Sequence, residues 1–333
     1  MRNISKKAGI IIALLTLSLI FSMALAGCGK SEQNKEVKWP EKPVTVIVPY
    51  GPGGGADQVA RILAGIAEKK TGVKFTVVNK TGAVGSTGLL ELSKANPDGY
   101  TIGIMPSNIS TYKVAGIAPL THEDFKLAIA VNYDACALIV RKDSGWNTFE
   151  DFKKAAQTKE LKVATGSPGG LWHLGVIELE NKTGLKFNTV PMSTGGAPAG
   201  VQLLGGHVDA IVIGPNEAAS QIKSGDFKIL AVMAPERSEN FKDVPTFKEL
   251  GYDIDVRSVR GIAAPKGTPD DIVKKIHDIF KEAAQDQQYK DYMKNSLSNA
   301  TYMSTEEYTK YAANELISYS ELMKKAGLAK EGK

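Results

Sequence analysis

The sequence predicts an α/β protein built from two units, each a sheet flanked by helices. Three observations support this fold class. Short apolar runs of strand length recur along the chain, glycine-rich loops follow several of them, and helix-length amphipathic segments come after the loops. Strands that alternate with helices favour a parallel, doubly wound sheet, in which the glycine loops gather at the carboxyl edge.

The composition is that of a globular protein. The chain has 333 residues, of which 43% are hydrophobic and 23% charged, and these values exclude a disordered chain and a multi-span membrane protein. A chain this long usually divides its core between two domains. The net charge of +5 comes without a basic block, so nucleic acid is not an expected partner. Two cysteines exclude a disulfide framework and a cysteine-rich zinc site.

The N-terminus has the layout of an export signal. It begins with three basic residues, Arg2, Lys6 and Lys7, and continues with an uncharged aliphatic stretch over 9–26. The end of this segment resembles a bacterial lipobox, with Cys28 placed for lipidation. We therefore expect residues 1–27 to be a lipoprotein signal peptide, with a membrane-anchor helix as the alternative. Its removal lowers the net charge from +5 to +2, and 28–40 then form a lipidated, flexible tether.

The first unit is expected to be a βαβαβ arrangement. Strands are predicted over 44–48, 74–79 and 100–105. Glycine loops over 51–55 and 82–86 precede the two helices between them.

A second α/β unit follows. Its expected strands cover 161–165, 187–190, 208–213 and 227–233. Thr148 and Asp151 have the spacing of a capping box at the start of a helix, as do Ser304 and Glu307 near the end of the chain. The apolar run around Cys136 predicts a buried, inert thiol rather than a nucleophile.

The C-terminal segment reads as helices without partner strands, packed back on the first unit. The chain would then cross between the units twice, near 137–142 and near 257–265, and two crossings make a natural hinge. Lobe 1 is expected over 41–140 plus 259–333, and lobe 2 over 141–258.

The glycine loops predict an anion site. Glycine lets the backbone approach a ligand, and helix N-termini present free N–H groups with partial positive charge. The alternative is that the glycines only form tight turns. Candidate ligand-binding residues in the first unit are Tyr50, Pro52, Gly53, Gly54, Gly55, Asp57, Gly82, Ala83, Val84, Gly85, Ser86, Ser107 and Asn108. Those in the second are Thr165, Gly166, Ser167, His173, Ser193, Thr194, Gly195, Gly196, Ala197, Pro215 and Asn216.

Two of these candidates have a structural alternative. Asp57 could cap its helix, or it could order the loop or bind a ligand donor or water. His173 could contact the ligand or cap and pack its own helix.

A dinucleotide site is the main rival interpretation. Residues 51–56 satisfy G-x-G-x-x-A after a strand, which would suit an NAD(P)-dependent oxidoreductase. The second strand, however, ends in Asn79 and Lys80 rather than in the acidic residue that holds a ribose. The sequence also lacks H-E-x-x-H, G-x-S-x-G and Walker A motifs, so we expect a protein that is not an enzyme and that needs neither cofactor nor metal.

The chain resembles the Bug-type substrate-binding receptors of tripartite tricarboxylate transporters. The resemblance starts at 39–57, with WPEKPV followed by IVPYGPGGGAD, and continues in NKTGAVGS and PDGYT at 79–86 and 97–101. It extends through GGAP and LGGHVD at 195–198 and 204–209. Arg237, VPT at 244–246 and GIAAPKGTP at 261–269 complete it, so the matches span nearly the whole mature chain in order.

This resemblance implies a two-lobed periplasmic-binding-protein fold of type II, the Venus-flytrap arrangement. It implies an exported lipoprotein, anchored at the outer face of the cell membrane or in the periplasm. Such a receptor is a monomer that binds a small organic acid and delivers it to membrane permease subunits. The resemblance also implies that 52–57 and 82–86 grip a carboxylate through backbone N–H groups and ordered water, while second-lobe loops read the rest of the ligand.

The chain departs from the family pattern at two positions. Val259 stands where the family usually has Trp, and Met192 where an aromatic residue often follows the proline. The ligand identity stays open among citrate-like acids, C4-dicarboxylates, acidic amino acids and aromatic acids.

Overall fold

The structure is a computed structural model that describes residues 38–192 and 195–330. Contacts divide the chain after Lys38, and Trp39–Lys333 form one compact unit. The expected signal peptide, the lipidation site Cys28 and the candidates Ser193 and Thr194 lie outside the described residues. In the described ranges, no helix is both long and apolar enough to cross a membrane.

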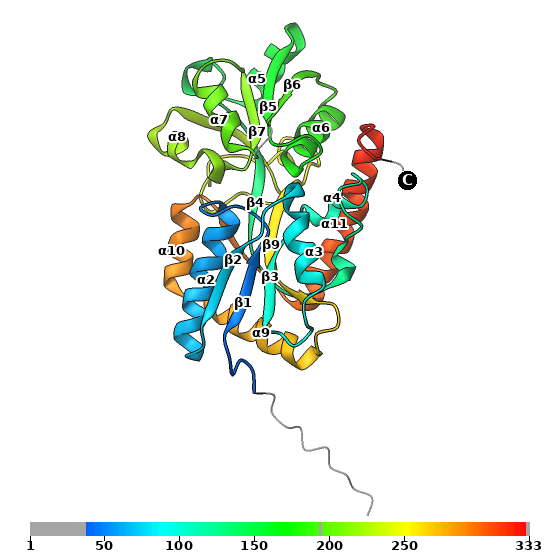
Figure 1. The fold of residues 1–333 in the computed structure, drawn as a ribbon. Coiled ribbons are helices and arrows are strands. Elements are labelled where there is room, and N and C mark those ends of the chain that lie inside the picture. Colours follow the sequence, from blue (N-terminus) through cyan, green and yellow to red (C-terminus); the bar gives the residue numbers. More distant parts are fainter. Residues whose placement is uncertain (1–37, 193–194, 331–333) are drawn as a thin grey trace, which may run out of the picture. The chain divides into compact units, whose positions relative to one another are not determined.

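The first sheet contains the expected parallel βαβαβ unit (Figure 1). Strand β1 (Val44–Val48) lies between β2 (Phe75–Asn79) and β3 (Thr101–Pro106) and runs parallel to both. Helices α2 (Gly55–Thr71) and α3 (Ser86–Ser93) make the two crossovers. The side chains of β1 are buried along almost its whole length, as expected for a parallel strand covered on both faces.

A long strand, β4 (Phe125–Arg141), belongs to two sheets. Up to Ala135 it pairs antiparallel with β9 (Arg257–Pro265), which also pairs with β3. From Cys136 onward it pairs antiparallel with β7 (Ala210–Ile213) and β8 (Phe227–Met233). The strand therefore changes partners just before the segment where the sequence predicted the first crossing, and β9 begins where it predicted the second.

The second sheet repeats the parallel pattern. β5 (Leu161–Thr165) lies between β6 (Phe187–Pro191) and β7, parallel to both. The helices of this lobe are α5 (Phe149–Thr158), α6 (Leu171–Thr183), α7 (Ala197–Leu204) and α8 (Ala219–Ser224). The predicted capping box of α5 is confirmed, because Thr148 and Asp151 exchange side-chain and backbone hydrogen bonds. Cys136 is fully buried, and burial raises the pKa of its thiol well above the usual value, which confirms the prediction of a buried thiol.

The C-terminal segment differs from its prediction in one element. Helices α9 (Asp270–Ala284) and α10 (Gln287–Asn295) pack against α2 as expected. Residues 299–303, however, form β10 (Asn299–Met303), an edge strand paired antiparallel with β4, so the prediction of helices without partner strands is wrong here. Its side chains are only partly buried or exposed, and such a strand carries little apolar pattern in the sequence.

The last helix reaches both lobes. Helix α11 (Thr305–Lys325) begins with the predicted capping box of Ser304 and Glu307. It packs against α4 (Ile109–Tyr112) of the first lobe, while Tyr319, Leu322 and Met323 near its end belong to the hydrophobic cluster of the second lobe. Besides β4 and the return of the chain at the start of β9, this helix is therefore a third connection between the two lobes (Figure 1).

Candidate functional site

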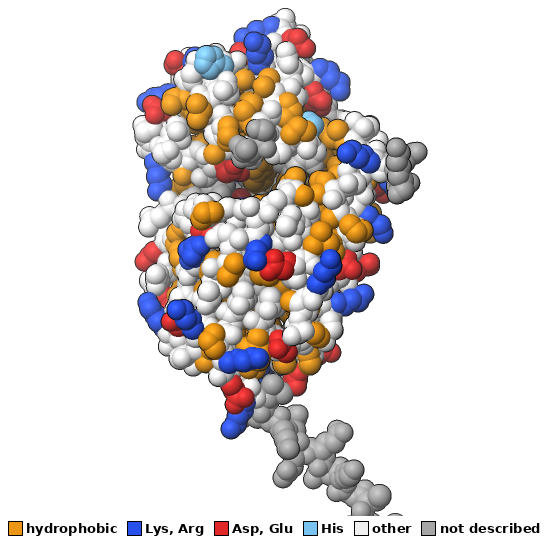
Figure 2. All heavy atoms as spheres, in the orientation of Figure 1, with side chains coloured by type: hydrophobic (Ala, Val, Ile, Leu, Met, Phe, Trp, Pro, Cys, Tyr) orange, Lys and Arg blue, Asp and Glu red, His pale blue; other side chains and the backbone are white. Residues whose placement is uncertain are grey.

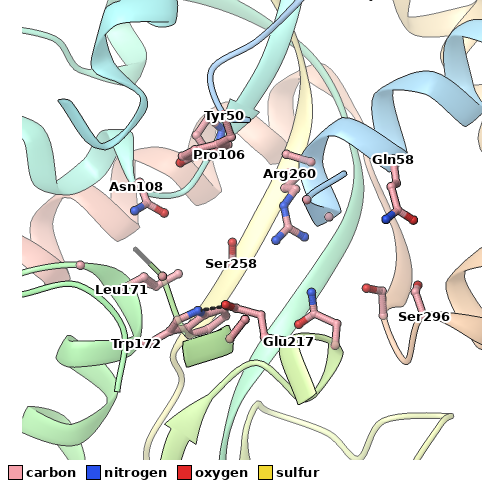
Figure 3. A pocket seen from close by; sticks show the side chains of 18 of the residues that line it. Tyr50, Gln58, Pro106, Asn108, Leu171, Trp172, Glu217, Ser258, Arg260 and Ser296 are labelled. Atoms are coloured by element: carbon pink, nitrogen blue, oxygen red, sulfur yellow. Dashed lines mark hydrogen bonds between the residues drawn. The ribbon is translucent and has the colours of Figure 1, made fainter. Parts of the chain in front are cut away.

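A cavity of about 780 Å³ lies between the lobes and is lined by both. This volume is in the range of small-molecule sites. Figure 2 shows the recess on one face of the molecule, and Figure 3 shows its lining from close by. Ten of the residues proposed from the sequence line it: Tyr50, Gly53, Gly54, Gly55, Val84, Asn108, Ser167, Gly195, Ala197 and Asn216.

The glycine loop after β1 is held in shape by Asp57. The Asp57 carboxylate accepts a hydrogen bond of 2.8 Å from the backbone N–H of Gly53, whose φ of +83° suits glycine. It also accepts bonds from Arg61 and from Asn79 Nδ2, both at 2.9 Å. Asp57 is 2% exposed and does not line the cavity, so of the roles considered for it, the structure shows the ordering of the loop.

Hydrogen bonding also sets the charge state of Asp57. Burial acts to raise the pKa of Asp57, but the bonds from Arg61, Gly53 and Asn79 outweigh it, and the pKa lies below its usual value. The carboxylate is therefore ionised at neutral pH, and both of its oxygens can accept hydrogen bonds from the N–H and guanidinium donors.

The second glycine loop has an unusual backbone. Gly82, Ala83, Val84 and Gly85 all have positive φ, and the Tyr112 hydroxyl donates a bond of 2.7 Å to the Val84 carbonyl. A Cβ on Gly85 would lie 2.9 Å from that hydroxyl, so only glycine fits. Val84 is the one member of the predicted 82–86 loop that lines the cavity.

Several lining residues were not predicted from the sequence, and Arg260 is the positively charged one among them. It lies on β9, is 9% exposed, and pairs through Nη1 with the buried Asp134 of β4. Its Nη2 would be 3.8 Å from a Cβ added to Gly55, which places it beside the N-terminus of α2 (Figure 3). Among hydrogen bonds within the described ranges, Nη1 alone binds a protein group, so the other guanidinium N–H groups are available to a ligand.

Arg260 keeps its charge despite this burial. Burial acts to lower the pKa of Arg260, but Asp134, together with Tyr50 and Glu217, outweighs this effect, and the pKa lies above its usual value. A guanidinium and a helix N-terminus at one wall of a cavity together favour a carboxylate or a phosphate.

The second lobe presents a carboxylate to the same cavity. Glu217 lies in the 3-10 helix Pro215–Ala218 and accepts hydrogen bonds from Trp172 Nε1 and, at 2.6 Å, from the Gly196 backbone N–H. Figure 3 shows Glu217 and Trp172 side by side on the wall facing Arg260. Burial raises the pKa of Glu217, and its two donors and the Arg260 charge offset only part of that effect.

Comparison with known proteins assigns the family. A family model described as "Tripartite tricarboxylate transporter family receptor" matches residues 59–328. The chain belongs to this family. It is also 31% identical to a UPF0065 protein of Cupriavidus necator, over 99% of this receptor and 98% of that protein.

Solved structures agree with the fold. A TctC solute-binding protein from Polaromonas is 36% identical, with a TM-score of 0.77 over 86% of this receptor and 100% of that chain. Two Rhodopseudomonas palustris proteins, each 24% identical, share the fold: MatC, solved with malate, and one solved with adipate, with TM-scores of 0.71 and 0.75. They cover 85% and 88% of this receptor and 99% of their own chains. The predicted two-lobed periplasmic-binding-protein fold is thereby confirmed, and the family and its solved members are solute-binding receptors rather than enzymes.

Several predicted polar groups of the receptor are bound to the protein instead of facing the cavity. Thr165 Oγ1 donates to the Val212 carbonyl at 2.8 Å, and Ser107 exchanges hydrogen bonds with the Val259 backbone. His173 Nδ1 accepts from the Gly169 N–H at 2.9 Å, which fits the capping alternative. Burial lowers the pKa of His173, so the ring is neutral near pH 7.

Some of the predicted residues do not reach the cavity. Twelve described candidates lie outside its lining: Pro52, Asp57, Gly82, Ala83, Gly85, Ser86, Ser107, Thr165, Gly166, His173, Gly196 and Pro215. Val259, one of the two departures from the family pattern, is fully buried in the core of the first lobe and also lies outside the lining.

The missed residues carried a signal that could have been used. Arg260 interrupts an apolar strand, and Asp134 interrupts another. Opposite isolated charges in buried strands are seldom tolerated unless they are paired.

Proposed function

We infer that this receptor captures a small organic carboxylate between its two lobes and delivers it to a membrane permease of a tripartite tricarboxylate transporter. The observation that carries this proposal is the position of Arg260 in the cavity, with Nη2 beside Gly55 at the start of α2. A carboxylate placed there accepts hydrogen bonds from the guanidinium and from backbone N–H groups of the loop. Each charge-assisted bond of this kind contributes about 1.5–3 kcal/mol.

The same location favours a carboxylate that is enclosed rather than bound on an open surface. Lining residues come from both lobes, β4 crosses between them, and the chain returns to the first lobe at the start of β9. The lobes 41–140 plus 259–333 and 141–258 would turn about these crossings. A ligand drives closure only if it binds the closed form more tightly than the open one, and contacts with both walls supply that difference. The closed surface would then be recognised by the permease.

The relatives support this class of ligand. The two Rhodopseudomonas palustris structures hold malate and adipate, both of them dicarboxylates. A nucleotide-dependent oxidoreductase, the alternative considered from the sequence, has no such support. β2 ends in Asn79, which is bound to Asp57 and to the Tyr50 carbonyl, and not in the acidic residue that binds a ribose in dinucleotide sites.

The proposal includes export and a lipid anchor on Cys28, so that the receptor acts as a periplasmic or surface-anchored monomer. The test is expression of the full chain and of Cys28→Ser, followed by separation of membrane and soluble fractions. We expect the full chain in the membrane fraction and Cys28→Ser in the soluble fraction. Equal partition of the two proteins would refute the anchor and would leave the carboxylate site unaffected.

Ligand capture is tested with the mature protein against a panel of malate, adipate, citrate, glutamate, benzoate, inorganic phosphate and NAD. A ligand present at 100 times its Kd stabilises the folded state by about 2.7 kcal/mol, which amounts to several degrees in Tm. We expect such a shift with at least one carboxylate, confirmed by isothermal titration calorimetry. A shift with phosphate or NAD alone, or with no compound, would refute the proposed function.

A further inference from the structure

The cavity contains an anionic group that a simple carboxylate ligand does not use. Glu217 faces the interior from the second lobe, opposite Arg260. A receptor for dicarboxylates alone would be expected to present a cation or neutral donors on both walls. We therefore expect a separate group of the ligand to bind the Glu217 carboxylate.

The charges around the cavity do not neutralise Glu217. The charge of Arg260 is matched by Asp134, with which it forms a buried ion pair. In the described ranges, no Lys, Arg or His nitrogen lies within 4.0 Å of the Glu217 carboxylate; its two protein donors, the Trp172 ring and the Gly196 backbone, are uncharged. The Glu217 carboxylate is thus a hydrogen-bond acceptor with unused lone pairs on the wall formed by the second lobe.

We propose that the ligand of this receptor is an amino-substituted carboxylate, whose carboxylate binds at Arg260 and the α2 N-terminus and whose ammonium group binds Glu217. This proposal rests on the function proposed above. The two ends of such a ligand meet walls of opposite charge, whereas the second carboxylate of a dicarboxylate would face Glu217 and be repelled.

Neighbouring contacts hold Glu217 ready for this task. Trp172 donates to Oε1 and Gly196 to Oε2, so the carboxylate is fixed in one orientation before a ligand arrives. Each carboxylate oxygen can accept a further hydrogen bond. The other ionisable groups that interact electrostatically with Glu217 are Arg260, Asp134 and the Cys136 thiol, and burial keeps the thiol protonated.

The test uses pairs of ligands that differ only in the second end group. 3-Aminopropanoate is compared with succinate, 4-aminobutanoate with glutarate, 5-aminopentanoate with adipate and 6-aminohexanoate with pimelate, and the common α-amino acids are added. Affinities are measured by titration calorimetry with the wild-type mature protein. We expect at least one amino-carboxylate to bind tenfold or more tightly than the dicarboxylate with the same spacer, or an α-amino acid to exceed all dicarboxylates by that factor.

The variant Glu217→Gln then removes the charge and keeps the size of the side chain. We expect the preference for the ammonium ligand to fall to threefold or less. Glu160→Gln, which removes one exposed carboxylate from the same lobe outside the cavity, should leave the preference unchanged. Thermal unfolding of both variants reports their folding, and the wild-type comparison stands without either variant.

The outcomes separate the two proposals. Dicarboxylates that bind as tightly as or more tightly than their amino partners, or a preference that survives Glu217→Gln, would overturn the ammonium site while the carboxylate function stands. If no carboxylate of any kind binds, both proposals fail together.

Discussion

Gly55 offers the sharpest test of where the carboxylate binds. It is the first residue of α2, and its backbone does not require glycine, since its φ is not positive. A Cβ at this position would lie 3.5 Å from Asn216 Nδ2 and 3.8 Å from Arg260 Nη2. Both distances are ordinary contacts, so alanine would fit, but the further carbons of a leucine would extend into the space between α2, Asn216 and Arg260.

Gly55→Leu should therefore block ligand binding without harming the fold. Displacing the carboxylate from the guanidinium removes at least one charge-assisted hydrogen bond, about 1.5–3 kcal/mol, which is roughly a 10- to 150-fold rise in Kd. Leucine is the better helix former by up to about 1 kcal/mol, so Tm should not fall. Calorimetric titration with the best carboxylate of the panel measures Kd, and a thermal scan without ligand measures Tm.

Gly65→Leu is the matched control. Gly65 lies in the same helix, and a Cβ there would meet nothing within 4 Å. This variant should bind like the wild type. A Kd for Gly55→Leu within about twofold of the control would refute the placement of the carboxylate at α2 and Arg260, because the side chain would then occupy space that the ligand does not need.

Three further predictions concern the stability of the loops and of the hinge region. Asp57→Asn should lower the free energy of unfolding at pH 7 by roughly 1.5–3 kcal/mol, the contribution of one charged hydrogen bond. Because the folded state lowers the pKa of Asp57, this difference from the wild type should shrink as the pH falls below about 3.8, the pKa of Asp57 in the unfolded chain; a difference in urea unfolding that does not change with pH would contradict this. In Gly85→Ala, the residue keeps a φ of +97° and its new Cβ lies 2.9 Å from Tyr112 Oη, so this variant should lose more stability than Gly225→Ala, where φ is +81° and nothing lies within 4 Å of the Cβ. Equal losses of Tm in the two variants would exclude the clash with Tyr112. Burial raises the pKa of Glu315, 7% exposed on α11, to about 8, so the folded state keeps a proton that the unfolded state loses above about pH 4.5. The Tm of Glu315→Gln should therefore rise relative to the Tm of the wild type as the pH increases from about 5 to 8, and a difference in Tm that stays constant over this range would refute the raised pKa.

Local patterns carried the parts of the fold that depend on neighbours in sequence. β1, its glycine loop and α2 follow one another within 44–71, and each is specified by burial, backbone freedom or helical spacing over a few residues. The same holds for the caps at Thr148 and Ser304, where one side chain three residues from another suffices. Ten cavity residues were found this way because the loops at the carboxyl edge of a sheet converge regardless of distant contacts.

Contacts between distant segments were out of reach of such patterns. β4 pairs with β9, β10, β7 and β8, which follow it in the sequence by many residues. The hydrophobic pattern of a strand does not indicate which distant strand it will pair with. The Arg260–Asp134 pair spans 126 residues. The expectation that backbone N–H groups of the glycine loops grip the carboxylate did not include this pair, because Arg260 and Asp134 lie on β9 and β4, outside those loops.

Arg260 and Glu217 belong to different lobes, and this difference suggests an order of events in ligand capture. Arg260 lies on β9, which pairs with β3 and with the first half of β4, and Gly55 follows β1 in the same sheet. The proposed anion-binding wall would therefore move as one body with the first lobe, and closure would not change its geometry. Glu217 and Trp172 belong to the second lobe, beyond the partner change of β4 at 135–136. A ligand should accordingly bind first by its carboxylate to the preformed wall of the first lobe, and the contacts that distinguish one carboxylate from another are completed only when the second lobe closes.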